Sequence, residues 1–123
     1  MKVTDYYPVF YTEYLENETK RYCEDLGFTV VHRPQIEMLD YVVMENENKR
    51  RVDLVRSYFP ADSFKEGYLG MRVNVDDFEQ GAAYFKERGY DIFGTTHDTQ
   101  SCKTALLTNG DGTYIVIFQH KKH

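Results

Sequence analysis

The chain has 123 residues, of which 41% are hydrophobic and 28% charged, with a formal net charge of -5. This is the size of one domain with enough apolar residues for a core, so an intrinsically disordered chain is excluded. No long basic run is present, no apolar stretch approaches the roughly 18 residues of a membrane span, and the start does not resemble a signal peptide. We therefore expect a cytoplasmic protein that binds neither nucleic acid nor membranes.

The first half of the chain predicts a strand, a helix and three more strands. Leu15, Thr19, Tyr22 and Leu26 recur at the spacing of one helix face, and Gly27 follows where a left-handed residue ends a helix. Cys23 falls on the same apolar side, which predicts a buried, inert thiol. The expected elements are a strand over 5–13, a helix over 15–26, and strands over 28–33, 39–45 and 50–57.

The second half of the chain repeats this order. Phe78, Ala82 and Phe85 show the same helical spacing. Candidate residues for the two ends of this helix are Asp76, Asp77 and Gly89. The expected elements are a strand over 68–76, a helix over 77–88, and strands over 90–95, 103–108 and 113–120.

One offset aligns the two halves. Position 78 minus position 15 is 63, and the same shift places the polar turn 46–49 on 109–112 and the strand 52–54 on 115–117. The sequence therefore predicts an α+β fold of two βαβββ modules in tandem. We expect one domain over 1–123, made of module 1–57, linker 58–66 and module 67–123. A single helix covers only one face of each sheet, so the other face needs a ligand or a partner.

The motifs and their order resemble the vicinal oxygen chelate superfamily, which includes glyoxalase I, extradiol dioxygenases and bleomycin-resistance proteins. The matching stretches are Thr12-Glu13-Tyr14-Leu15-Glu16, Asp25-Leu26-Gly27-Phe28, Val73-Asn74-Val75-Asp76-Asp77 and Asn109-Gly110-Asp111-Gly112. The resemblance implies a glyoxalase-like domain whose mixed sheets curve round a central cleft, usually in a homodimer. Sedimentation should then give a mass near twice 14.6 kDa.

The resemblance also places the metal ligands of the superfamily's enzymes. They fall on Tyr7, Asp53, Gly70 and Val116, and only Asp53 offers a usual donor for a divalent ion. We therefore expect no metal at this position and no cofactor. Pro8, directly after Tyr7, resembles the bleomycin-resistance branch, which works without a catalytic metal.

Strand alternation predicts which side chains face the cleft. The expected ligand-binding residues are Tyr7, Val9, Tyr11, Arg51, Asp53, Arg72, Asn74, Tyr114 and Phe118. The opposite, helix-facing set is Phe10, Val52, Leu54, Met71, Val73, Val75, Ile115 and Ile117. Aromatic walls with a few charges suit a planar, possibly cationic ligand. Alternatively, Arg51 or Arg72 only neutralises Asp53.

These features favour a metal-free binding protein that sequesters or senses a small molecule such as an antibiotic, rather than an enzyme. The alternative is a metal-dependent lyase, isomerase or dioxygenase, which would have to recruit His32, Glu37 or Glu13 as ligands. Catalysis without metal would use Tyr7, Tyr11 or Glu13 as general acid or base. A third possibility is a catalytically silent assembly module, whose cleft is filled by its own side chains.

Overall fold

The computed structural model describes residues 1–36, 39–57 and 64–121. Glu37, His123 and most of the predicted linker lie outside these residues. The described residues form two helices and nine strands: β1 (Val3–Tyr11), α1 (Leu15–Leu26), β2 (Thr29–His32), β3 (Gln35–Ile36), β4 (Leu39–Glu45), β5 (Arg51–Ser57), β6 (Gly67–Val75), α2 (Phe78–Lys86), β7 (Asp91–Asp98), β8 (Cys102–Thr108) and β9 (Tyr114–His120). None of the described helices is long and apolar enough to cross a membrane.

The chain forms two compact units. One is continuous and comprises residues 8–69, and the other comprises residues 1–7 together with 70–123. The division falls inside the long strands β1 and β6. The modules predicted from the repeat have other boundaries, and their place in the domain organisation stays a prediction.

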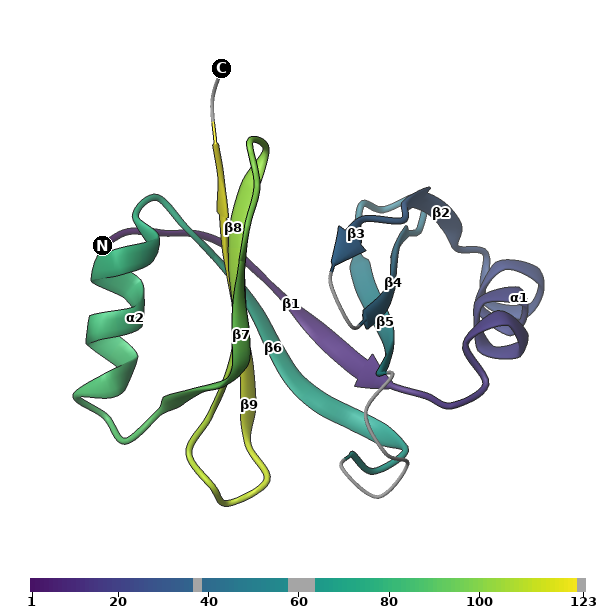
Figure 1. Cartoon of the computed structure of the whole chain (residues 1–123). Helices are drawn as coiled ribbons and strands as arrows, with labels where there is room; N and C mark the ends of the chain where they lie inside the picture. Colours follow the sequence, from purple (N-terminus) through teal and green to yellow (C-terminus); the bar gives the residue numbers. More distant parts are fainter. Residues whose placement is uncertain (37–38, 58–63, 122–123) are drawn as a thin grey trace. The chain divides into compact units, whose positions relative to one another are not determined.

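In the 8–69 unit the strands lie in the order β2-β4-β5-β1, with the short β3 beside β4 (Figure 1). The end of β1 runs parallel to β5, with Val9 opposite Asp53, whereas β4 and β5 are antiparallel. Helix α1 lies on one face of this sheet and covers an apolar cluster. The buried members of this cluster are Leu15, Val42, Met44 and Leu54.

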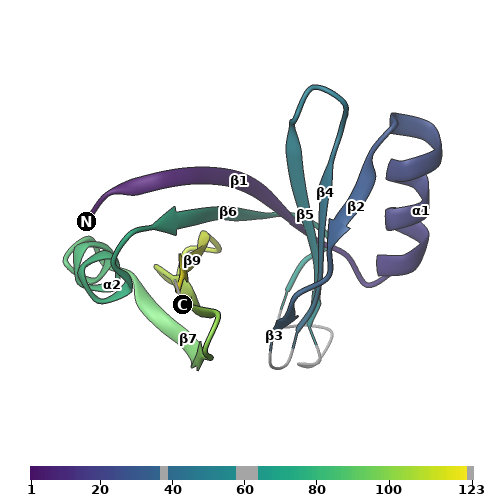
Figure 2. The same ribbon diagram turned by 90° about the horizontal axis from the view of Figure 1, so that it is seen from above.

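The second unit repeats this plan with the strand order β1-β6-β9-β8-β7. Its strands β1, β6, β9 and β7 are labelled in Figure 2, together with α2. Strands β6 and β9 are parallel, with Arg72 opposite Val116, and β8 and β9 are antiparallel. Helix α2 covers a second apolar cluster. Its buried members are Val73, Val75, Phe78, Ala105, Leu107 and Ile117.

The strand registers confirm the repeat. Adding 63 to the pair Val9 and Asp53 gives Arg72 and Val116, which are also partners. All eight residues predicted to face the helices belong to, or pack against, these two apolar clusters. The α+β fold with two βαβββ modules is therefore confirmed, and most predicted strand ends differ from the observed ones by only one or two residues.

The two helices begin differently. The Asp77 side chain accepts a hydrogen bond of 3.0 Å from Gln80 N at the start of α2, as predicted for a capping residue. Tyr14 occupies the same place before α1 and provides no side-chain cap. Gly27 ends α1 at φ 74°, a left-handed conformation that suits glycine.

Candidate functional site

The predicted ligand-binding residues belong to both units. Val9, Tyr11, Arg51 and Asp53 lie in the 8–69 unit, and Tyr7, Arg72, Asn74, Tyr114 and Phe118 lie in the other. In each unit the strand alternation directs them away from the helix, since their neighbours in sequence form the helix-facing clusters. That all nine line one common cleft stays a prediction.

Asp53 is the most enclosed charged residue of the site. Its carboxylate lies in the middle of β5 with no exposed surface. Arg51 donates to both oxygens, from Nε to Oδ1 at 2.9 Å and from Nη2 to Oδ2 at 3.3 Å. The hydroxyl of Tyr41, on the neighbouring β4, donates a short hydrogen bond to Oδ2. Burial of a carboxylate is tolerated when its charge and lone pairs are satisfied in this way.

Tyr41 was missed by the sequence analysis. It is only 2% exposed and lies two residues before Val43, which stands opposite Asp53. Residues two apart on a strand share a face, so the predicted hairpin of strands 39–45 and 50–57 already implied that Tyr41 and Asp53 lie on the same face. The Tyr41 hydroxyl donates to the Asp53 carboxylate, so the two residues form a buried hydrogen-bonded pair. Arg51 balances the negative charge of Asp53.

Tyr11 lies on the same face of the sheet. Strand β5 lies between β1 and β4, and its residue Val55 stands opposite Tyr11 of β1 and Tyr41 of β4. The Tyr11 ring packs on Phe64 with a centroid distance of 5.3 Å. Burial, and next the negative charge of Glu13, raise the pKa of the Tyr11 phenol. Tyr11 therefore stays protonated at neutral pH and serves as a hydrogen-bond or proton donor rather than as a base.

The residues at the four metal positions do not fit a divalent ion. Both carboxylate oxygens of Asp53 already accept hydrogen bonds, from Arg51 and Tyr41. The Tyr7 hydroxyl donates to Asp5 Oδ2 at 2.6 Å. At Gly70 a Cβ atom would lie 1.8 Å from the carbonyl oxygen of Tyr114, so no liganding side chain has room there. Val116 is apolar and buried. Within the described ranges no group of three or more His, Cys, Asp or Glu residues has the arrangement of a metal site.

The residues suggested as alternative metal ligands do not form a cluster either, as far as they belong to the described residues. His32 is exposed on the edge strand β2, and Glu13 is exposed just after β1. Glu37 lies outside the described residues. We therefore derive no catalytic step through a metal ion. Cys23 and Cys102 are free thiols, and Cys23 packs half-buried against the core of the 8–69 unit.

The unit of residues 1–7 and 70–123 has a polar cluster of its own. Arg72 is 3% exposed, and its Nε donates to Asn74 Oδ1 at 3.0 Å. The guanidinium carbon of Arg72 lies 3.8 Å from the centre of the Phe118 ring, a stacked cation–π contact. Strand alternation had predicted that these three residues share a face.

Solved structures resemble this fold over nearly its whole length. Methylmalonyl-CoA epimerase from Mycobacterium tuberculosis matches with a TM-score of 0.75 and 13% identity, covering 98% of this chain and 90% of the epimerase. A Streptomyces coelicolor epimerase variant in complex with 2-nitronate-propionyl-CoA gives 0.73 and 12%, covering 98% and 100%. A methylmalonyl-CoA epimerase bound to methylmalonyl-CoA and NH4+ gives 0.72 and 12%, covering 97% and 96%. No family model matches the chain, and no curated protein matches it.

The chain has the vicinal oxygen chelate fold. The structural similarity confirms the predicted fold, while nothing in it points to the bleomycin-resistance branch in particular. Our expectation of a metal-free protein that sequesters or senses a planar ligand, rather than an enzyme, is wrong, because methylmalonyl-CoA epimerases are prominent among the solved structures that this chain resembles. The comparisons favour the enzymatic alternative instead.

Proposed function

We propose that this chain is an enzyme of the isomerase type, which moves a proton on a small acyl thioester or carbonyl compound. The similarity in fold to methylmalonyl-CoA epimerases supports the reaction class. The buried cluster of Asp53, Tyr41 and Arg51 carries the assignment to residues, because a hydrogen-bonded acid–base pair is what a proton transfer requires.

In the proposed reaction a proton leaves the carbon next to a carbonyl group and returns to the same carbon. The pair of Tyr41 and Asp53 is the proposed acceptor and donor of that proton. Arg51 keeps the pair neutral overall in its buried surroundings, where an uncompensated charge is costly. Tyr11, which the raised pKa keeps protonated, would donate a hydrogen bond to the carbonyl oxygen as negative charge develops there.

The test is exchange of the substrate's carbon-bound proton with solvent. Methylmalonyl-CoA and a panel of other branched acyl thioesters and small ketones would be incubated with the protein in D2O, and deuterium uptake followed by NMR. We expect uptake from at least one class, with and without added divalent metal. Asp53→Asn should slow it by about 10²- to 10⁴-fold, the usual contribution of a general acid or base. Tyr41→Phe should also slow it while leaving the ion pair of Arg51 and Asp53 in place.

Asp40→Asn is the matched control. Asp40 lies on β4 and pairs with its register partner Arg56 on β5 at 2.7 Å, so the same chemical change is made between the same two strands. This variant should exchange deuterium at the wild-type rate. Absence of uptake from the whole panel, or equal rates in Asp53→Asn and the wild type, would refute the proposal.

We also propose that the enzyme is a cytoplasmic homodimer. The basis is the wider resemblance, together with the exposed aromatic surface of β1, where Tyr6 is 67% exposed. Sedimentation decides the oligomeric state through the mass expected above.

A further inference from the structure

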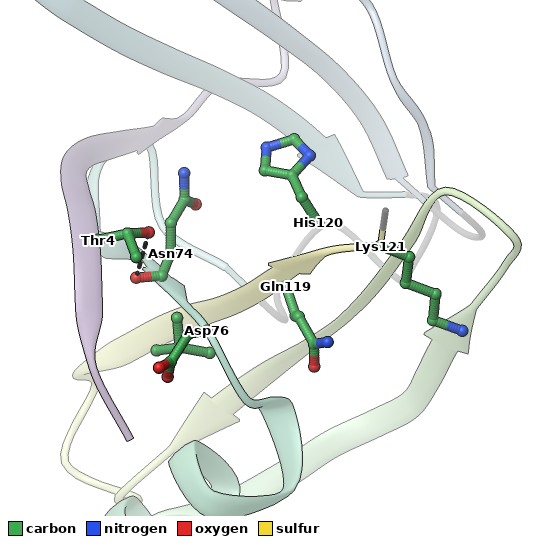
Figure 3. A pocket seen from close by; sticks show the side chains of 7 residues that line it. Thr4, Asn74, Asp76, Gln119, His120 and Lys121 are labelled. Atoms are coloured by element: carbon green, nitrogen blue, oxygen red, sulfur yellow. Dashed lines mark hydrogen bonds between the residues drawn. The ribbon is translucent and has the colours of Figure 1, made fainter. Parts of the chain in front are cut away.

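A pocket of about 680 Å³ opens in the unit of residues 1–7 and 70–123, at the carboxyl ends of β6 and β9 (Figure 3). The last register pair of these parallel strands is Asn74 and Phe118. Beyond it β6 continues into α2, while β9 runs on to the tail, so the strand ends are no longer paired. The lining residues are Thr4, Asn74, Val75, Asp76, Gln119, His120 and Lys121.

The side chain of Asn74 is oriented by its neighbour. A guanidinium group only donates hydrogen bonds, so the Arg72 Nε bond identifies the atom facing Arg72 as the Asn74 oxygen. The amide nitrogen Nδ2 must then point away from Arg72. Asn74 is 7% exposed, and this nitrogen bonds to no described residue. No buried side-chain nitrogen or oxygen of the described residues lacks a partner, so Nδ2 keeps contact with the open space of the pocket.

A hydrogen-bond acceptor lies beside this donor. The Thr4 hydroxyl donates to the backbone oxygen of Asn74 at 3.3 Å, which leaves its lone pairs available (Figure 3). Elsewhere in the lining, Asp76 accepts the Lys2 N–H through Oδ1 at 2.7 Å. The pocket therefore presents an N–H donor next to a hydroxyl acceptor.

The charges of the lining disfavour an anion. The Lys121 ammonium forms an ion pair with Asp98, whereas Asp76 forms no ion pair with any described residue. The side that remains uncompensated is negative, so a carboxylate or phosphate ligand would be repelled. A cation would satisfy Asp76 but would leave Asn74 Nδ2 without an acceptor.

We propose that this pocket binds a small uncharged carboxamide. The ligand's carbonyl oxygen accepts from Asn74 Nδ2, and its N–H donates to Thr4 Oγ1. This site lies in the other unit from the cluster of Asp53 and Tyr41, and it does not depend on the proposed isomerase activity.

Three probes of similar size and different charge test the proposal: propionamide, propionate and propylammonium. Each would be titrated into the full-length protein, and the side-chain NH2 signals of Asn74 and Gln119 followed by NMR. We expect propionamide to shift the Asn74 signal saturably and to bind more tightly than the other two. Asn74→Asp keeps the acceptor for Arg72 but replaces the donor by a carboxylate. It should weaken propionamide by at least about tenfold, the loss of one good hydrogen bond, and should prefer propylammonium instead.

Asn109→Asp is the control, because it makes the same chemical change in the turn before β9, where Asn109 caps Asp111 N at 2.9 Å. It should leave all three affinities unchanged. Thr4→Val, at an exposed position, should weaken propionamide and serves if Asn74→Asp does not fold. Tighter binding of propionate, or an unchanged order of the probes in both pocket variants, overturns the proposal.

Discussion

The two halves of the chain use one backbone plan and place their polar clusters at different points of it. Among the described residues of the 8–69 unit, the buried charge is Asp53, paired with the half-buried Arg51, and the 63-residue shift carries these positions to Val116 and Tyr114. In the other half the buried charge is Arg72, whose counterpart is Val9. Each half thus has an apolar residue where the other has its charge.

The helix-covered faces, in contrast, carry the same kind of residue in both halves. Leu54 and Ile117 are counterparts at this shift, and both are buried apolar residues beneath a helix. The helix-facing residues specify the fold in both halves, because close packing tolerates little change there. The other face of each sheet is the part where the halves have acquired different chemistry.

The largest expected effect tests the paired positions Gly70 and Tyr7. Gly70→Ala should reduce the free energy of unfolding by about 3 kcal/mol, because the new Cβ would lie 1.8 Å from the Tyr114 carbonyl oxygen and force backbone movement. Tyr7→Ala, which loses a half-buried phenol, should cost about 1 kcal/mol. Urea unfolding measures both. Equal costs would show that the close strand approach at Gly70 is not a special feature of that half.

A smaller effect is expected at the helix starts. Asp77→Ala removes the bond to Gln80 N and should destabilise the protein by about 1 kcal/mol. Tyr14→Asp introduces the missing cap at the equivalent place and should stabilise it by a similar amount. Thermal unfolding of the two variants should therefore shift in opposite directions. A lower melting temperature for Tyr14→Asp would mean that the Tyr14 ring contributes more than the cap.

The smallest effect concerns pH, since Tyr11 titrates and its counterpart Asn74 does not. Burial and Glu13 raise the pKa of Tyr11, so the folded state favours the protonated phenol. Its contribution to stability is complete below the ordinary value of 10.0 and is lost as pH rises through the higher folded value. Tyr11→Phe should therefore lose less stability than the wild type between neutral pH and pH above 10.0. Identical pH profiles from urea unfolding would contradict this.

The fold was predictable because its signals are periodic. Helical spacing located α1 and α2, and alternation separated residues such as Leu54 and Ile117 from Asp53 and Arg72. The strand β3 was not predicted because it has only two residues, too few to show a periodic pattern. Tyr41 is absent from the predicted site because that prediction covers the first and last strands of each half and not β4.

The function was misjudged for a different reason. The missing metal ligands at Gly70 and Val116 and the Pro8 motif favour a binding protein when the sequence is considered alone. An absent set of metal ligands, however, argues only against one mechanism. The hydrogen-bonded pair of Tyr41 and Asp53 lies on two neighbouring strands, and the pairing of β4 with β5 brings the two side chains together.

The division of β1 between the two units has a consequence for the order in which the units can fold during translation. Residues 8–69 form a continuous unit, so every part of it has been synthesised before residues 70–123. The other unit joins residues 1–7 to residues 70–123, as when Asp76 N donates to Lys2 O at 3.1 Å and the amino group of Met1 donates to Gln80 at 2.7 Å. Its sheet includes β9, which ends at His120, and contacts so distant in sequence form late. Residues 1–7 therefore complete their sheet only after β9 has been synthesised, whereas the residues that form the 8–69 unit are all present earlier.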